Sequence, residues 1–103
     1  MMSFRKLVSD DNSQLIIFIE DSFDFSSHQN FRNAYGEYNA VGGTIIVDLS
    51  KTSYMDSSAL GMLLLLKDHV EKHNGTLVIS KPNETVNKVL EIAQFHRLMN
   101  IEK

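Results

Sequence analysis

The stretch Tyr54-Met55-Asp56-Ser57-Ser58-Ala59-Leu60-Gly61 lies between a predicted strand and a predicted helix, and the rest of the fold follows from it. Five apolar residues, Met62 to Leu66, come directly after it. They belong to a long helix that we place at about residues 57–73. Asp and Ser lead the ranking of helix N-cap residues, so an acid followed by two hydroxyls predicts a helix start here. By itself, this pattern indicates an N-cap and no more.

Two apolar segments flank this helix and predict parallel strands. Residues 44–49 and 76–80 are short runs rich in Ile, Val and Leu, a composition typical of strands that are covered on both faces. Residues 50–55 between the first strand and the helix are expected to be a short loop. Asn74-Gly75 is expected to end the helix, with Gly in the left-handed conformation.

The helix itself has one charged and one apolar side. Lys67–Glu71 and Asp68–Lys72 are opposite charges four residues apart, and they mark the exposed side. The buried side is expected to hold Met62, Leu63, Leu65, Leu66 and Val70.

The N-terminal part predicts a hairpin and then a helix. Residues 4–8 and 15–19 are predicted strands on either side of the polar turn 9–13, and the continuous apolar character of 15–19 predicts burial on both faces. Residues 24–27 offer several helix N-caps. The aromatic and alanine side chains that follow recur at helical spacing, at Phe31, Ala34, Tyr35 and Tyr38.

The C-terminal part predicts one more helix and a short final strand. Pro82 precedes the helix, where it costs little. The element order is therefore β-β-α-β-α-β-α-β, and strand–helix–strand units favour parallel pairing with right-handed crossovers. The expected fold class is α/β, with a small mixed sheet of four to five strands flanked by about three helices.

Composition narrows the function further. The chain has 103 residues, which suits a single domain over residues 1–103, and it contains no cysteine. A net charge of −3 argues against a nucleic-acid partner. The longest apolar run is far shorter than the roughly 20 residues that span a bilayer, and no signal peptide is expected at the N-terminus. We expect a cytoplasmic protein without membrane insertion.

The sequence resembles the STAS domain family, of the bacterial anti-sigma factor antagonist (anti-anti-sigma factor) type. The likeness is carried by residues 45–49, by 54–61 and by the turn and strand 74–78. Residues 86–90, together with Phe95, resemble the family's third helix and the turn after it. The element order agrees over nearly the whole chain, while the Asp-Ser-Ser turn is the specific part. The resemblance implies the STAS fold for this chain.

The resemblance also implies a function and a set of site residues. It implies that Ser57 is a phosphate acceptor and that Asp24 is a second acid near the same surface. The implied partners are an anti-sigma factor that is a serine kinase of the Bergerat ATP-binding type, and a metal-dependent serine phosphatase. The protein itself would need no cofactor and would not be an enzyme. We expect the partner-binding surface to comprise Asp24, Tyr54, Met55, Asp56, Ser57, Ser58 and Leu60.

The chain departs from the family pattern at three places. Ala59 and Asp21 stand where the family usually has Gly, and Asp21 precedes the first helix, so the shape of that loop depends on it. The chain ends at Lys103, so the family's usual last helix is expected to be missing or very short. Because that helix helps to cover one sheet face, a homodimer contact or an altered partner surface is expected.

Other functions remain as alternatives. Ser57 lacks the Gly-x-Ser-x-Gly setting of a hydrolase nucleophile, and no histidine has an evident route to it. His69 and His73 are four residues apart, a spacing that can bind metal, but no third ligand is apparent and solvated histidines are expected. A constitutive scaffold subunit of a transporter or signalling assembly, and a nucleotide- or small-molecule-binding module of the same fold, are the two remaining alternatives.

Overall fold

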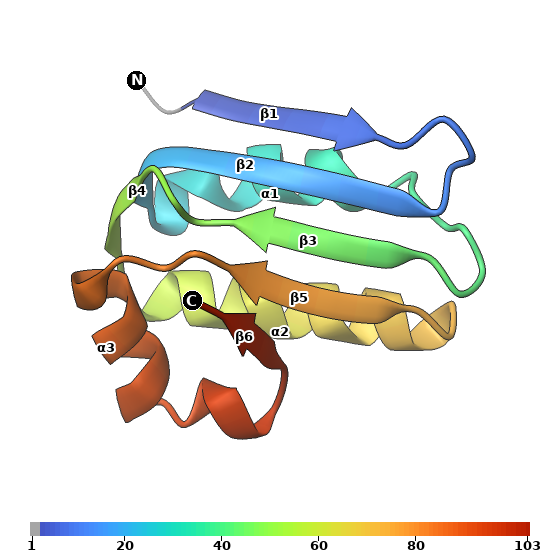
Figure 1. The fold of residues 1–103 in the computed structure, drawn as a ribbon. Coiled ribbons are helices and arrows are strands. Elements are labelled where there is room, and N and C mark those ends of the chain that lie inside the picture. The colour runs from blue at the N-terminus through green and yellow to red at the C-terminus, as the bar shows by residue number, and fades with distance from the viewer. Residues whose placement is uncertain (1–2) are drawn as a thin grey trace.

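The computed structural model describes residues 3–103 as one mixed sheet with helices packed on it (Figure 1). The strands are β1 (Ser3–Val8), β2 (Gln14–Phe23), β3 (Thr44–Asp48), β4 (Thr52–Met55), β5 (Thr76–Ser80) and β6 (Asn100–Glu102). The helices are α1 (His28–Tyr35), α2 (Ser57–Lys72) and α3 (Glu84–Ile92), with short 3-10 turns η1 (Phe25–Ser27) and η2 (Phe95–Arg97). The predicted fold class and element order are confirmed, with one additional strand, β4.

The sheet has one helix-covered face and one open face. Its strand order is β1-β2-β3-β5-β6, with β1 antiparallel to β2 and the others parallel. Along this order, β3, β5 and β6 are each added on the same side of the strand before, so right-handed crossovers place the connecting helices on the same face, while β4 pairs with the end of β2. Figure 1 shows α1 and α2 behind the sheet, with no helix in front of β2, β3 and β5.

The predicted burial of the strands on both faces is therefore wrong. Leu15, Ile17 and Ile19 of β2 are fully buried, whereas Ile16 and Phe18 between them are half-exposed. The same alternation occurs in β3. The apolar residues of these strands that are not in the core form one cross-strand row on the open face, Leu7, Ile16, Ile46 and Val78, between polar residues such as Thr44 and Asp48.

β4 was expected to be a loop, and it forms because β2 is unusually long. Residues 14–18 of β2 pair with β3, and residues 21–23 pair with β4 after a bulge between Asp21 and Ser22. Thr52 is buried and its hydroxyl donates to the Ile19 carbonyl at 2.7 Å, which fixes the start of β4 on β2. Because β4 is short and mostly polar, its sequence has no apolar alternation that would identify a strand.

The bulge holds Asp21 at φ +64°, in the left-handed region. Glycine takes this conformation without steric cost, and Asp is among the few other residues that tolerate it. The departure from the family pattern at this position therefore leaves the loop in a glycine-like conformation. The backbone N–H of Asp21 donates to the Lys51 carbonyl at 3.0 Å, which ties the bulge to the start of β4.

Two details of α2 differ from expectation. The ion pairs Lys67–Glu71 (2.6 Å) and Lys72–Asp68 (3.2 Å) form as predicted, but Leu65, which was expected in the core, is 51% exposed. At the end of α2 it is Asn74, at φ +55°, that takes the left-handed conformation. Gly75 is needed for another reason, because a Cβ there would collide with the Gly43 carbonyl.

Within residues 3–103, none of the helices is both long and apolar enough to cross a membrane.

Candidate functional site

Two helix-start turns lie side by side at one end of the sheet. The last residues of β2 and β4, Phe23 and Met55, are parallel partners, so the next residues, Asp24 and Asp56, begin adjacent turns. The Asp56 N–H lies 3.4 Å from the Phe23 carbonyl and continues this pairing. The sheet thus brings Asp24 and Asp56 together, as the family resemblance implied.

Asp56 is the N-cap of α2. Its backbone is extended, and its Oδ1 accepts from the N–H groups of Ser58 (3.0 Å) and Ala59 (3.2 Å). These N–H groups belong to the first turn, where the helix has no backbone partner for them. The cap fixes where α2 begins and therefore which serine stands at its first position.

The two serines of the turn have different environments. The Ser58 hydroxyl donates to Asp56 Oδ1 at 2.5 Å and its side chain is half-buried. Ser57 is exposed, and its hydroxyl makes no hydrogen bond within residues 3–103. Ser57 is therefore the hydroxyl that a second protein could reach without disturbing the cap.

The same Asp-x-Ser geometry recurs at Asp24. Its Oδ1 accepts from the N–H (3.0 Å) and the hydroxyl (2.6 Å) of Ser26, in the way that Asp56 accepts from Ser58. Phe25 then occupies the position that Ser57 has in the other turn, and it is 77% exposed. Sequence reasoning missed Phe25, although the repetition of Asp-x-Ser could have identified it.

Two further Asp-x-Ser turns show that this hydrogen-bond pattern is a structural device. Asp48 accepts from the N–H and hydroxyl of Ser50, and Asp11 does the same with Ser13. The Ser13 hydroxyl is the main reason that the pKa of Asp11 falls to about 2. What distinguishes the Asp56 turn is that its middle residue, Ser57, carries an exposed hydroxyl, whereas the other three turns have Phe25, Leu49 and Asn12 at this position.

Most of the residues expected at the partner-binding surface reach the surface. Tyr54 is 51% exposed, and Asp24, Asp56, Ser58 and Leu60 are half-exposed. The expected contribution of Met55 is wrong, because this side chain is 3% exposed and belongs to the core. Successive side chains of a strand point to opposite faces, so Met55 at the end of β4 points inward and Tyr54 before it points outward.

Two of the four histidines, His69 and His73, take structural roles in the second half of α2. His69 Nε2 donates to the Tyr38 carbonyl at 2.7 Å, and His73 Nδ1 lies 2.8 Å from the His69 carbonyl. His69 thus ties the loop after α1 to α2, while His73 bonds back onto α2 itself, so the expectation of solvated histidines is wrong. His69 follows Ser57 by twelve residues, which is about 18 Å along a helix. In the described part of the chain, no three His, Cys, Asp or Glu side chains form a group suited to a metal.

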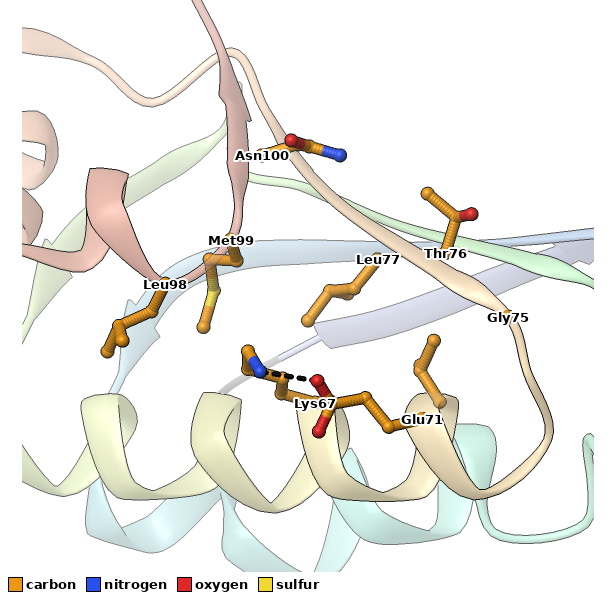
Figure 2. Close-up of a pocket in the computed structure, with 9 residues that line it drawn as sticks. Lys67, Glu71, Gly75, Thr76, Leu77, Leu98, Met99 and Asn100 are labelled. Carbon is orange, nitrogen blue, oxygen red and sulfur yellow. Dashed lines mark hydrogen bonds and ion pairs between the residues drawn. The ribbon is translucent and has the colours of Figure 1, made fainter.

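A cavity of about 300 Å³ lies elsewhere on the molecule, between α2 and the β5–β6 edge (Figure 2). β6 pairs only with residues 78–80 of β5, which leaves residues 75–77 at an open edge. Lys67 and Glu71 form an ion pair on one wall, and Leu98 and Met99 line the opposite wall. None of Asp56, Ser57 and Ser58 lines it, so the cavity provides no link between a small molecule and the Asp-Ser-Ser turn.

Comparison with known proteins relates this geometry to one family. The model of the STAS domain family matches residues 5–103. A STAS-domain containing protein of Pseudomonas aeruginosa strain UCBPP-PA14 is 41% identical over 100 residues, which cover 97% of this chain and 99% of that protein.

Solved structures share the fold at lower identity. A putative anti-sigma factor antagonist of Thermotoga maritima is 22% identical with a TM-score of 0.81, over 97% of this chain and 86% of that one. The anti-sigma factor antagonist SpoIIAA in its unphosphorylated form is 23% identical with a TM-score of 0.82, over 98% of this chain and 89% of that one. The phosphorylated form of Bacillus SpoIIAA is 20% identical with a TM-score of 0.67, over 98% and 92% of the two chains.

Proposed function

The chain belongs to the STAS domain family, and on this premise we propose that it is a phosphorylation-controlled protein-interaction switch of the anti-sigma factor antagonist type. The unphosphorylated protein binds an anti-sigma factor that is also a serine kinase of the Bergerat ATP-binding type. Phosphorylation at Ser57 releases it, and a metal-dependent serine phosphatase resets the switch. These ATP-dependent partners belong to the cytoplasm, where we place the protein.

The observation that supports this proposal best is the difference between Ser57 and Ser58. Ser57 is exposed and its hydroxyl has no hydrogen-bond partner in the described residues 3–103, whereas the Ser58 hydroxyl donates to Asp56 at 2.5 Å. A kinase could modify Ser57 while the Asp56 cap and the start of α2 stay intact. Modification at Ser58 would break the bond to Asp56 and bring the phosphate against its carboxylate.

The electrostatics of the turn favour a change of surface over a change of fold. A phosphate at the first turn of a helix gains about 0.3–1 kcal/mol from the helix dipole, and like-charge repulsion from Asp56 opposes this gain. The modification adds about 1.5–2 negative charges to an exposed hydroxyl. A partner that buries Ser57 would then have to desolvate an unpaired dianion. The loss is about 2–5 kcal/mol, or roughly 30- to 5,000-fold in affinity.

The surroundings of Ser57 support a substrate role rather than a catalytic one. A serine nucleophile needs a base within hydrogen-bond reach and a third group that orients the base. His69 and His73 stand at the other end of α2 and bond to backbone carbonyls there. In this view, the protein is a substrate of other enzymes.

The first test compares two substitutions at Ser57. The kinase is recovered from the source cells on immobilised protein, and its affinity for each variant is measured by isothermal titration calorimetry. Ser57→Ala should bind as the wild type does, because the surface stays neutral. Ser57→Asp should bind at least about 30-fold more weakly. Equal affinities for the two variants would refute the switch.

A matched control separates the position of the charge from its presence. Asn100→Asp adds one negative charge at an exposed residue of the distant edge strand β6, and it should leave the affinity unchanged. If Asn100→Asp weakened binding as much as Ser57→Asp, net charge would explain the effect and Ser57 would have no special role.

A further inference from the structure

The outer edge of β1 is unpaired. β1 is the first strand in the sheet order, and in the part of the chain that the structure describes no segment pairs with its outer side (Figure 1). The Ser9 N–H donates to the Gln14 carbonyl at 2.9 Å, and backbone groups point alternately to the two sides of an antiparallel strand. The N–H and C=O groups of Phe4, Lys6 and Val8 therefore point outward, where a further strand could bind them.

β1 lacks most of the features that keep an edge strand from pairing. Such strands are usually short, bulged or interrupted by proline, or they carry charged side chains. β1 is six residues long without proline, and its register with β2 is regular. Leu7 and Val8 are 60% and 46% exposed. Arg5 and Lys6 are the only charged residues of β1, so the pairings that they exclude decide which strand fits.

Arg5 and Lys6 limit how two copies of β1 can pair. Two copies related by a two-fold axis pair antiparallel. The outward-pointing residues of one copy must face those of the other, so the axis passes through a residue position. An axis at Arg5 or Lys6 would place two like charges directly opposite each other, which is destabilising.

An axis at Leu7 avoids both of these contacts. Along the ladder of residues 3–9, an axis at Phe4 or Val8 would pair fewer residues of each copy than an axis at Leu7 does. The axis at Leu7 places Lys6 opposite Val8 of the second copy. Because the N–H and C=O groups of these two residues point outward, they can bond to each other across the edge.

On the open face, this axis joins two apolar rows. Leu7 is the last residue of the row that continues through Ile16, Ile46 and Val78. In the joined sheet it meets Leu7 of the second copy, so the row runs without a break across both copies. Side chains directly opposite each other contribute to the stability of a strand pair, and this contact covers a leucine that the single chain leaves exposed.

On the helix-covered face, the same register brings opposite charges together. Asp10 of the second copy falls beside Phe4 and Lys6, at the end of the paired segment. A cavity of about 380 Å³ lies there between β1 and α1, and Asn30 and Asn33 line it together with these two residues. Lys6 has no ion-pair partner in the described chain, and the exposed Asp10 of the second copy would supply one.

We propose that two copies of this chain associate through the outer edges of β1, antiparallel and with Leu7 on the two-fold axis, and so form one continuous sheet. The proposal is independent of the proposed function, because no residue of the Asp24 or Asp56 turn takes part in the contact. Each copy keeps its own Ser57.

Sedimentation equilibrium of the purified protein tests the association. An edge pair of this length buries less than a standard interface of about 1,600 Å², so we expect a weak dimer that forms between about 10 and 500 µM. Leu7→Lys places two like charges on the axis and should raise the dissociation constant at least about tenfold. The control Ile92→Lys changes a more exposed apolar residue, 84% against 60%, at the end of α3 and should leave the dissociation constant unchanged.

A charge exchange tests the register. Lys6→Glu brings an acid beside Asp10 of the second copy and should raise the dissociation constant about threefold. Combining it with Asp10→Lys restores a pair of opposite charges, so the double variant should return to the wild-type value. A double variant that dimerises as weakly as Lys6→Glu alone would mean that the assigned register is wrong.

Amide hydrogen exchange, followed by NMR at low and high protein concentration, identifies the surface. The N–H groups of Lys6 and Val8 should exchange about fivefold more slowly at high concentration, because the second copy bonds them. The Ser9 N–H is already bonded to Gln14 and should not change.

Wild-type protein that stays monomeric over the whole concentration range would rule out the proposal. A dimer in which the Lys6 and Val8 amides exchange as fast as in the monomer would place the contact elsewhere, for example on the open sheet face, and would also rule it out. Protection of these amides that arises only after cell extract is added would assign the edge to a different protein and contradict self-association.

Discussion

At the residue scale, the three consecutive residues of the Asp-Ser-Ser turn each have a different role. Asp56 caps the helix, Ser58 is bonded to Asp56, and Ser57 is left exposed between them. The N-cap was predictable from sequence because Asp and Ser favour that position. Which serine the cap would hold followed only from the hydrogen bonds. The inward direction of Met55 was likewise missed, because nothing in the local sequence identifies β4 as a strand.

The cap predicts a measurable stability difference within one helix. Asp56→Ala removes the acceptor for two first-turn N–H groups, so the free energy of unfolding should fall by about 1 kcal/mol. Asp68→Ala removes an exposed carboxylate in the same helix and should change it by less than about 0.5 kcal/mol. Urea denaturation of the two variants gives both values. Equal losses would mean that Asp56 contributes no more than a surface charge.

At the element scale, β2 organises the site. Its first half pairs with β3 and its second half with β4, and the bulge at Asp21 joins the two registers. The apolar half of β2 was predictable from its run of Leu, Ile and Phe residues. The second half was not, because Glu20, Asp21 and Ser22 are residues that strands disfavour. Their pairing depends on β4, a contact between segments about thirty residues apart.

The bulge predicts a larger loss of stability for one substitution at Asp21 than for another. Asp21→Val places a β-branched residue at φ +64° and should lower the free energy of unfolding by about 1–2 kcal/mol. Asp21→Gly relieves the steric cost at the expense of chain entropy and should change it by less than about 1 kcal/mol. Denaturant midpoints of the two variants test this. If Asp21→Val were as stable as the wild type, the left-handed conformation assigned to this position would be wrong.

At the scale of the whole molecule, the order of the strands explains why the helices cover only one face of the sheet. Every crossover moves the same way along the sheet, so the helices gather on one face and the other face stays open. The runs of apolar residues predicted the strands correctly. They could not show which side chains lie under the helices and which face solvent, because apolar residues occur on both faces of the sheet. The apolar row Leu7, Ile16, Ile46 and Val78 lies on the open face, and a homodimer through this face stays a prediction.

The arrangement of the elements also explains how a phosphate on Ser57 could act as a switch. The Asp24 and Asp56 turns and the beginning of α2 meet at one end of the sheet, held by the β2–β4 pairing. Because the core and the cap do not use the Ser57 hydroxyl, a phosphate there would alter the surface presented to a partner and leave the scaffold unchanged.

The most direct measurement is phosphosite mapping of the protein purified from its source cells. Tandem mass spectrometry of the peptide that contains residues 54–66 distinguishes Ser57 from Ser58 by their fragment ions. We predict a phosphorylated fraction with the phosphate on Ser57, and its loss in the Ser57→Ala variant. Phosphate on Ser58, or a peptide that carries no phosphate under any growth condition tested, would contradict the proposed switch.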